Sequence, residues 1–327
     1  MLSKYKEDLL TLKFIKLKKG KLRMKRKFKR FSEHYNLKRG QEDLEFVDVL
    51  IDDDIELFLD PGRLLYFNDD FSVRCRNAVV EYFSKLLELI KKGKRKEALV
   101  MLSNLKEPKE THLGYSQASV YGKAIGENKA FILYRQLSNS KAVLTGILKD
   151  LEDSALLVEG IGIDCISDIT TVIIKKMLIE FTNQVCIKYG ISTKKVECGK
   201  IWNNKNDCWE KCIANLPCPN GFKMILVPKK YVVKKLVVNI SEFYNHEILD
   251  YYLEEKSNTN IGLVRVIKKG VLTKKELKKE YKISKKLVYD FCQKNPRALD
   301  KYKRRVTYKS IDENNLIEEA IQKKYLA

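Results

Sequence analysis

The spacing of hydrophobic residues predicts helices along much of the chain. Apolar side chains recur every three or four residues between residues 72 and 92, and Gly93 follows as a helix end. The same spacing predicts further helices over residues 97–105, 127–138, 141–151 and 165–188, the last ending at Gly190.

Shorter apolar runs predict strands between these helices. Residues 44–59 are rich in β-forming residues and alternate partly, which predicts one or two strands around the acidic turn at 52–54. Residues 155–158 and 223–227 are apolar runs of the length of a buried strand. We therefore expect a mixed body of α+β or α/β class over residues 41–240.

The C-terminal region, residues 241–327, is expected to be helical and to contain a tri-helical helix-turn-helix-like module over residues 273–305. Thr273 and Glu276 have the spacing of a capping box, and Ser284 can cap a second helix over 285–294. Asn295 and Pro296 can then open a third helix. A protein-docking bundle is the alternative. The residues expected on or beside the exposed face of the second helix, where a recognition helix reads the major groove, are Lys285, Lys286, Tyr289, Gln293 and Lys294.

The charge of the chain is concentrated at its two ends. The 327 residues include 64 Lys and Arg against 43 Asp and Glu, a net charge of +21. Residues 1–40, a basic N-terminal arm, hold 15 bases and three acids, and residues 268–305 hold 15 bases and four acids. This clustering predicts binding to nucleic acid, DNA rather than RNA, although a general lysine bias would also decorate solvated faces. Contact residues are expected in the arm at Lys25, Arg26 and Lys27.

A group of carboxylates in the body could hold a metal ion. Glu159 follows the predicted strand 155–158, and Asp164 and Asp168 stand four residues apart at the start of the next predicted helix. Asp60 ends another predicted strand and is a fourth candidate. Such oxygen ligands suit Mg²⁺, which could activate water for phosphodiester hydrolysis, with Glu159, Asp164 and Asp168 as catalytic residues. The alternative is that these acids are helix caps and ion-pair partners.

Other chemistries find less support. The segment from Gly114 to Lys123 is not a Walker A loop, because Ala124 stands where a metal-binding Ser or Thr is needed. Only Cys208 and Cys212 have zinc-ligand spacing, so we do not expect structural zinc. We expect the cysteines of residues 198–218 to be buried thiols on a helix and its flanks. Eight cysteines without a secretory signal or a membrane-length apolar run predict a cytoplasmic protein without a membrane partner.

The blocks 159–171, 226–229 and 284–296 resemble an uncharacterised family of prokaryotic proteins associated with phage-defence genes. The resemblance implies a defence context and no particular chemistry. Two functions of different class are therefore expected. The first is a metal-dependent nuclease that binds nucleic acid through its basic ends. The second is a non-catalytic nucleic-acid-binding or adaptor subunit of a larger defence complex.

Overall fold

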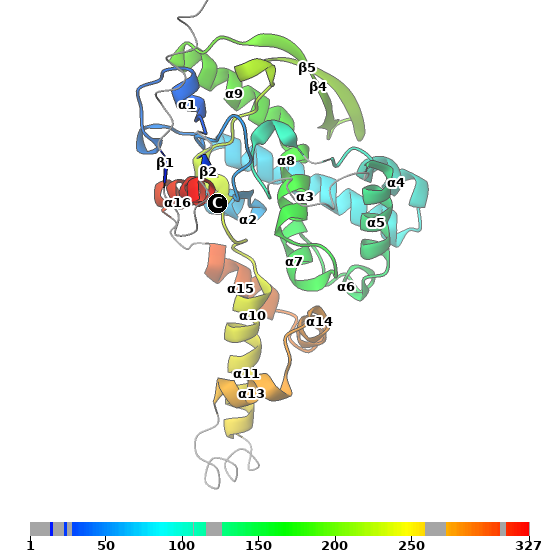
Figure 1. Ribbon diagram of the computed structural model, residues 1–327. Helices are drawn as coiled ribbons and strands as arrows, with labels where there is room; N and C mark the ends of the chain where they lie inside the picture. The colour runs from blue at the N-terminus through cyan, green and yellow to red at the C-terminus, as the bar shows by residue number, and fades with distance from the viewer. Residues whose placement is uncertain are drawn as a thin grey trace, which may run out of the picture.

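The computed structural model describes residues 14–15, 23–24, 28–106, 108–115, 126–258, 273–307 and 312–326. A helix-rich body is joined to a narrower extension of C-terminal helices (Figure 1). The described strands form three two-stranded sheets, all of them antiparallel. The class is therefore α+β, since the α/β alternative needs parallel strands.

The central helix of the body is α3 (Asp70–Lys91). Asp69 caps its start by accepting a hydrogen bond from the backbone N–H of Ser72 at 3.1 Å. Its apolar face, which includes Tyr82 and Leu86, is buried. Gly93 adopts a left-handed conformation (φ 67°) directly after the helix. The helix predicted over residues 72–92 is confirmed.

Most of the remaining helices of the body contact α3. Two of them, α8 and α9, were predicted as one helix, but the backbone breaks at Ile174 (φ −89°, ψ 10°). The helix predicted over 141–151 ends early, at Leu144. The helices are α1 (Phe31–His34), α2 (Pro61–Tyr66), α4 (Arg95–Leu102), α5 (Gly126–Ser138), α6 (Lys141–Leu144), α7 (Ser154–Leu157), α8 (Ile163–Ile173) and α9 (Lys175–Tyr189), with single turns η1 (Gln41–Asp43), η2 (Lys109–Thr111), η3 (Leu151–Asp153), η4 (Pro219–Gly221) and η5 (Lys229–Tyr231).

The strand predicted at residues 155–158 is wrong, because this segment is helix α7. The preceding turn η3 already has helical hydrogen bonding, and the carboxylate of Asp153 accepts the backbone N–H groups of Lys149 and Asp150 at 3.2 and 3.0 Å. The chain therefore enters residue 154 in a helical conformation, and Val158 N–H donates back to the carbonyl of Ser154. Glu159 follows a helix rather than a strand.

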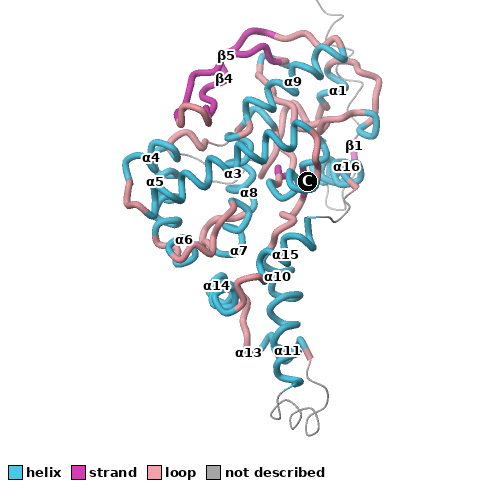
Figure 2. The backbone as a smooth tube through the Cα atoms, turned by 180° about the vertical axis from the view of Figure 1, so that it is seen from behind, coloured by secondary structure: helices cyan, strands magenta, loops and turns pink. Residues whose placement is uncertain are grey.

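The largest sheet is a hairpin that the sequence pattern did not predict. Strands β4 (Lys194–Asn203) and β5 (Cys208–Leu216) pair antiparallel, with Trp202 opposite Trp209 and an irregularity between Glu197 and Lys200. The hairpin arches over α9 at the edge of the body (Figure 2). It was missed because most of its side chains are exposed or half-buried, so apolar residues do not mark it.

The other predicted strands are mostly extended segments without continuous partners. Within residues 44–59 the only strand is β3 (Phe58–Leu59), which pairs with β6 (Val232–Val233). The rest of this range forms isolated bridges with other segments, such as Phe46 with Pro228, and no continuous ladder of strand pairing. Residues 224–227 of the predicted strand 223–227 are buried, and Met224 and Ile225 are hydrogen-bonded through their backbone, but the segment forms no strand. In the basic arm, β1 (Phe14–Ile15) pairs with β2 (Arg23–Met24).

The C-terminal extension is built from α10 (Ile240–Phe243), the π-helical turn η6 (Tyr244–Ile248), α11 (Leu249–Asn258), α13 (Lys274–Glu280), α14 (Lys285–Lys294) and α15 (Ala298–Thr307). The three short helices predicted at 273–305 are present, with the Thr273–Glu276 capping box and the Ser284 cap. Their packing differs from a self-contained bundle, because α13 packs on α11, α14 on α7 and α15 on α2.

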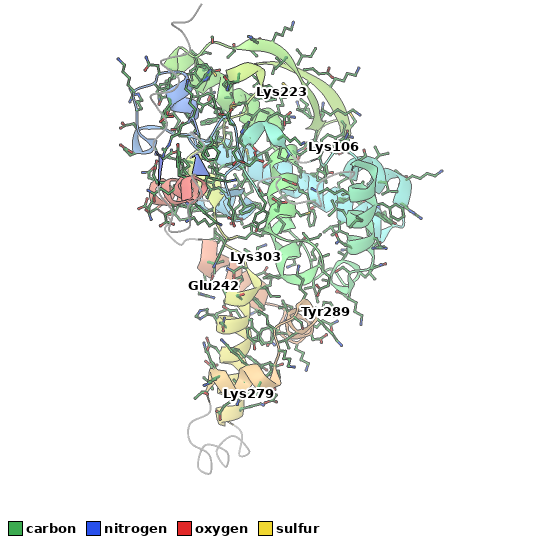
Figure 3. All side chains as sticks on the ribbon, viewed as in Figure 1. Lys106, Lys223, Glu242, Lys279, Tyr289 and Lys303 are labelled. Carbon is green, nitrogen blue, oxygen red and sulfur yellow. The ribbon has the colours of Figure 1, made fainter. Side chains whose placement is uncertain are left out.

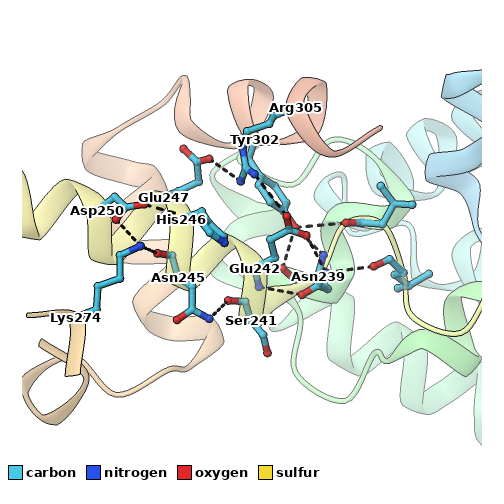
Figure 4. A network of polar contacts seen from close by, with 12 residues as sticks. Asn239, Ser241, Glu242, Asn245, His246, Glu247, Asp250, Lys274, Tyr302 and Arg305 are labelled. Carbon is cyan, nitrogen blue, oxygen red and sulfur yellow. Dashed lines mark hydrogen bonds and ion pairs between the residues drawn. The ribbon is translucent and has the colours of Figure 1, made fainter. Parts of the chain in front are cut away.

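Polar contacts hold the helices of this extension together (Figure 4). The hydroxyl of Tyr302 accepts from the backbone N–H of Asn239 and donates to its carbonyl, both at 3.0 Å. Arg305 pairs with Glu247 at 3.2 Å, and Lys274 donates to the carbonyl of Asn245 at 2.8 Å. These contacts attach α15 and α13 to the continuous helix α10–η6–α11.

The last helix, α16 (Glu313–Leu326), returns from the extension to the N-terminal part of the body. Arg30 makes two hydrogen bonds to the carboxylate of Glu318, at 2.6 and 2.8 Å. Arg63, which is buried, pairs with Glu313 at 2.8 Å. In the described part of the chain, no helix combines the length and apolarity needed to cross a membrane.

Candidate nucleic-acid interface

A cleft of about 1200 Å³ lies beneath the β4–β5 hairpin. Its walls come from the turn at 51–54, the loop 104–112, the junction of α8 and α9, the hairpin, and the residues after η4. Lys106 and Lys223, both on its wall, lie beneath the arc of the hairpin (Figure 3). We call this hollow the hairpin cleft.

Six lysines line the hairpin cleft. Four of them, on the rim, have exposed side chains, and no ion pair joins them to another residue of the described segments. Lys175 is buried and donates to the carbonyl of Cys198 at 2.5 Å. These lysines come from separate parts of the chain, so no local cluster in the sequence marks them. The six are Lys106, Lys109, Lys175, Lys200, Lys211 and Lys223.

Five acidic residues also line the cleft. Glu110 lies between Lys175 and Lys223, at 3.5 and 3.4 Å, so its charge is balanced within the wall. Asp53 pairs with Lys324 of α16 at 3.3 Å. Asp52, Asp54 and Glu197 complete the acidic lining. The rim lysines therefore face the opening, while part of the acidic charge is already neutralised.

Two further side chains give the cleft features of a binding surface. Phe222 lines it with 67% of its surface exposed, although it is a large apolar residue. His112 adopts a left-handed backbone conformation (φ 53°), which few residues other than glycine take. Its Nδ1 atom is buried and has no hydrogen-bond partner among the described residues. Non-glycine residues in this backbone conformation cluster at functional sites.

The predicted carboxylates lie in different surroundings. Glu159 is exposed, and Asp168 is buried with an ion pair to Lys129 at 2.8 Å. Burial alone would lower the pKa of Lys129, but the charge of Asp168 raises it above its ordinary value. Asp164 lies beside Gly114, where a Cβ atom would be 3.3 Å from its Oδ1. In the described structure, the carboxylate oxygens of Glu159, Asp164 and Asp168 do not form a cluster that could hold a metal ion.

Asp60 is the fully buried N-cap of α2. Its carboxylate accepts hydrogen bonds from the backbone N–H groups of Gly62 at 2.8 Å and Val237 at 2.6 Å. Burial raises the pKa of Asp60 to about 6, and the two amides act against this rise. Its oxygens thus serve the packing of α2 against the segment that leads to α10.

A different acidic group is formed by Asp150, Glu152 and Asp153, whose ligand atoms all lie within 4.8 Å of one another. The ammonium of Lys303 from α15 pairs with all three carboxylates, at 3.1 Å to Glu152 and 3.0 Å to Asp153. Burial raises the pKa of Glu152 to about 7, against the attraction of Lys303. The carboxylates in turn raise the pKa of Lys303, although burial opposes them. Three acids within residues 150–153 were a visible signal in the sequence.

The predicted nucleic-acid-binding residues of α14 divide into two sets. Lys286, Gln293 and Lys294 are exposed, as expected. Tyr289 is only 8% exposed, and Lys285 donates to the carbonyls of Ser154, Val158 and Ile161 at the end of α7 and in the turn after it. This part of α14 therefore faces the body, where the ammonium of Lys285 joins it to the end of α7 and the following turn. Lys25, Arg26 and Lys27 lie outside the described residues.

The four neighbouring cysteines are not on a helix, contrary to expectation. Cys198, Cys208 and Cys212 belong to the hairpin, and Cys218 follows it. The segment that was expected to be a helix forms the two strands β4 and β5 instead. All four are free thiols. No group of metal-ligating side chains that includes them is found in the described residues.

The sequence profile of one protein family, described as a domain of unknown function (DUF8370), matches residues 36–239, more than half of the chain. The chain belongs to the DUF8370 family. This confirms the expectation of an uncharacterised family. No curated protein and no solved structure matches the chain.

The DUF8370 region contains the lining of the hairpin cleft and the four predicted carboxylates. It ends at Asn239, the N-cap of α10, so the C-terminal extension and α16 lie outside it. Lys303 therefore joins a helix outside the DUF8370 region to three carboxylates inside it.

Proposed function

We propose that this chain binds nucleic acid and that the hairpin cleft holds a single strand. The observation that carries this proposal is the set of four exposed lysines, without ion pairs among the described residues, on the rim of one hollow of about 1200 Å³ with an exposed phenylalanine on its wall. Proteins that bind single strands combine a positively charged groove, which follows the phosphates, with aromatic side chains on which bases stack. The rim lysines and Phe222 supply these two elements.

The C-terminal helices form a second part of this proposal. Helices α13, α14 and α15 would act as the helix-turn-helix-like module, contacting duplex DNA through Lys286, Gln293 and Lys294, which are exposed. Lys285 and Tyr289 would position α14 against the body. In this function the chain is a nucleic-acid-binding or adaptor subunit, and the defence complex that the sequence resemblance implies would supply its protein partners.

The test measures binding of fluorescent single-stranded DNA, single-stranded RNA and duplex DNA to the full chain over a range of salt concentrations. Each phosphate contact to a single strand contributes about 0.7 to the slope of log K against log salt. Replacing Lys106, Lys109, Lys200 and Lys211 with Ala should therefore flatten the single-strand slope by up to about 3.

A matched control removes the same charge from the C-terminal extension, by replacing Lys275, Lys278, Lys279 and Lys282 with Ala. These lysines are exposed, and Lys279 lies far from the cleft (Figure 3). The control variant should keep the single-strand slope. If the cleft variant binds single strands as the unaltered chain does, the cleft is not the binding surface.

A metal-dependent nuclease is the second candidate function, with one observation in its favour. Asp150, Glu152 and Asp153 form a group that could hold a cation such as Mg²⁺. The ammonium of Lys303 already lies among these oxygens, which gives the binding function the stronger support. Glu159, Asp164 and Asp168 would act in catalysis only if nucleic acid or an ion drew them together.

Cleavage is tested by incubating the same nucleic acids with the chain and Mg²⁺, Mn²⁺ or EDTA. A nuclease requires cleavage that EDTA abolishes and that Asp164→Asn or Glu152→Gln removes. The absence of cleavage with either metal, together with calorimetry that detects no Mn²⁺ binding, would exclude the nuclease and leave the binding function.

A further inference from the structure

A second cavity, of about 520 Å³, lies where the C-terminal extension meets the body. It is open between the end of α5, helix α6, the end of α7 and helix α14. Its volume falls within the 300–1,000 Å³ that small-molecule sites occupy. We call it the seam pocket, because both the DUF8370 region and α14 form its walls.

The seam pocket has a basic mouth. Arg135, Lys141 and Lys286 line it from three different helices and are exposed. None of them forms an ion pair with another described residue, so their charges are available to a ligand. Glu159 and Asp290 are the acids that face the same space. The excess of positive charge favours an anion, and Arg in particular recognises phosphate oxygens in two-point contacts.

The interior of the seam pocket is different in character. Leu157 and Ala142 are buried, and Tyr289 contributes an aromatic ring with 8% of its surface exposed. These apolar surfaces suit a planar ring. Gln136 and Asn139 offer amide groups for hydrogen bonds at the same wall. Glu159 can accept a hydrogen bond from an amino or hydroxyl group of a ligand.

The wall itself is held in place by the backbone. Gly160 has a left-handed conformation (φ 78°), and a Cβ atom there would lie 2.0 Å from Nε2 of Gln136. The left-handed backbone favours glycine in the turn after α7, and the amide of Gln136 from α5 lies directly against it. On the other side, Lys285 donates to the carbonyls of the same turn, including that of Ile161 at 2.9 Å. The pocket is therefore formed before any ligand arrives.

From these features we propose that the seam pocket binds a free nucleoside phosphate. The phosphates would contact Arg135, Lys141 and Lys286, and the base would lie against Tyr289 and Leu157. A phosphate attached to a heterocycle could also come from a nucleic-acid strand, and the experiment separates these sources. The proposal does not depend on the hairpin cleft, since the two hollows share no lining residue.

The experiment is isothermal titration of the full chain with ATP, AMP, GTP and GMP, with inorganic pyrophosphate and a single-stranded tetranucleotide as comparison probes. The double variant Lys141→Glu with Lys286→Glu should weaken nucleotide binding at least tenfold, because both side chains are exposed and their change leaves the fold intact. The matched control, Lys275→Glu with Lys278→Glu, should bind as the unaltered chain does. Circular dichroism verifies that both variants fold.

A second readout follows from the position of the pocket. Nucleotide binding should slow hydrogen exchange in α14 and in the end of α5 together, because the ligand would bridge them. Equal binding of pyrophosphate would overturn the proposal, since the base would then contribute nothing. Binding of the tetranucleotide alone, or nucleotide binding unchanged in the double variant, would also overturn it.

Discussion

The buried group around Lys303 makes an unusual prediction: removing a charge from it should stabilise the protein at alkaline pH. Glu152 is buried, and burial raises its pKa from 4.5 to about 7. Below about pH 4.5 the carboxyl is protonated in both the folded and the unfolded chain, so it has no effect on the free energy of unfolding. Between pH 4.5 and 7 only the folded chain keeps this proton, so stability falls as the pH rises. Above pH 7 the whole penalty is present.

The size of this penalty follows from the pKa. A rise from 4.5 to about 7 corresponds to about 3 kcal/mol, at about 1.36 kcal/mol for each pKa unit. Glu152→Gln keeps the shape of the side chain but carries no charge at any pH. The variant should therefore match the unaltered chain near pH 4.5 and exceed its stability by about 3 kcal/mol at pH 8. Asp153 is less suitable, because its carboxylate also accepts two backbone N–H groups.

Urea unfolding at pH 5, 6, 7 and 8, followed by circular dichroism, measures this difference. Glu254→Gln is the control, since Glu254 is exposed, and it should leave the pH dependence unchanged. A Glu152→Gln variant that is destabilised equally at pH 5 and pH 8 would refute the reasoning. In that case Glu152 would be ionised throughout this range and would stabilise the fold through Lys303.

Substitutions at three further positions test the buried polar groups. Lys303→Met should reduce the free energy of unfolding at pH 7 by about 3–5 kcal/mol, measured in urea, because it leaves the two buried carboxylates of Glu152 and Asp153 without their cation. A smaller loss at pH 5 would reflect the protonation of these carboxylates. Asp60→Ala should destabilise by about 1–3 kcal/mol in the same measurement, because two buried backbone N–H groups lose their acceptor, whereas Asp60→Asn should cost less because the amide oxygen still accepts. Asp168→Asn should lower the melting temperature, because it leaves Lys129 partly buried without a counter-charge; an unchanged melting temperature would show that the Lys129 pair contributes nothing to the fold.

Local signals in the sequence predicted much of the helical structure. Periodic apolar residues located α3, and glycine at 190 located the end of α9. The caps at Thr273 and Ser284 were predicted because capping depends on residues only three positions apart. The apolar run 155–158 was misassigned because four residues are too few to separate the helical period from that of a strand.

Features that depend on distant parts of the chain could not be predicted in this way. The hairpin cleft is formed by lysines such as Lys106 and Lys211, which are about a hundred residues apart. Nothing near Lys285 in the sequence indicates that its ammonium meets carbonyl groups of residues 154–161, since that contact exists only after α14 packs on α7. The sequence identified the carboxylates of 159–168 by spacing alone, whereas the ion pair of Asp168 with Lys129 exists only because α5 and α8 both pack on α3.

The contact between Arg30 and Glu318 has a consequence for how the molecule forms. These residues are 288 positions apart in the chain. At a synthesis rate of about 5–20 residues per second, the segment around Arg30 waits roughly 15–60 s before α16 has been made. During that time the surface that α16 will cover, next to the buried Phe28 and Phe31, is open to solvent and to other chains. Packing of the segment around Arg30 is therefore completed late, only after α16 has been synthesised.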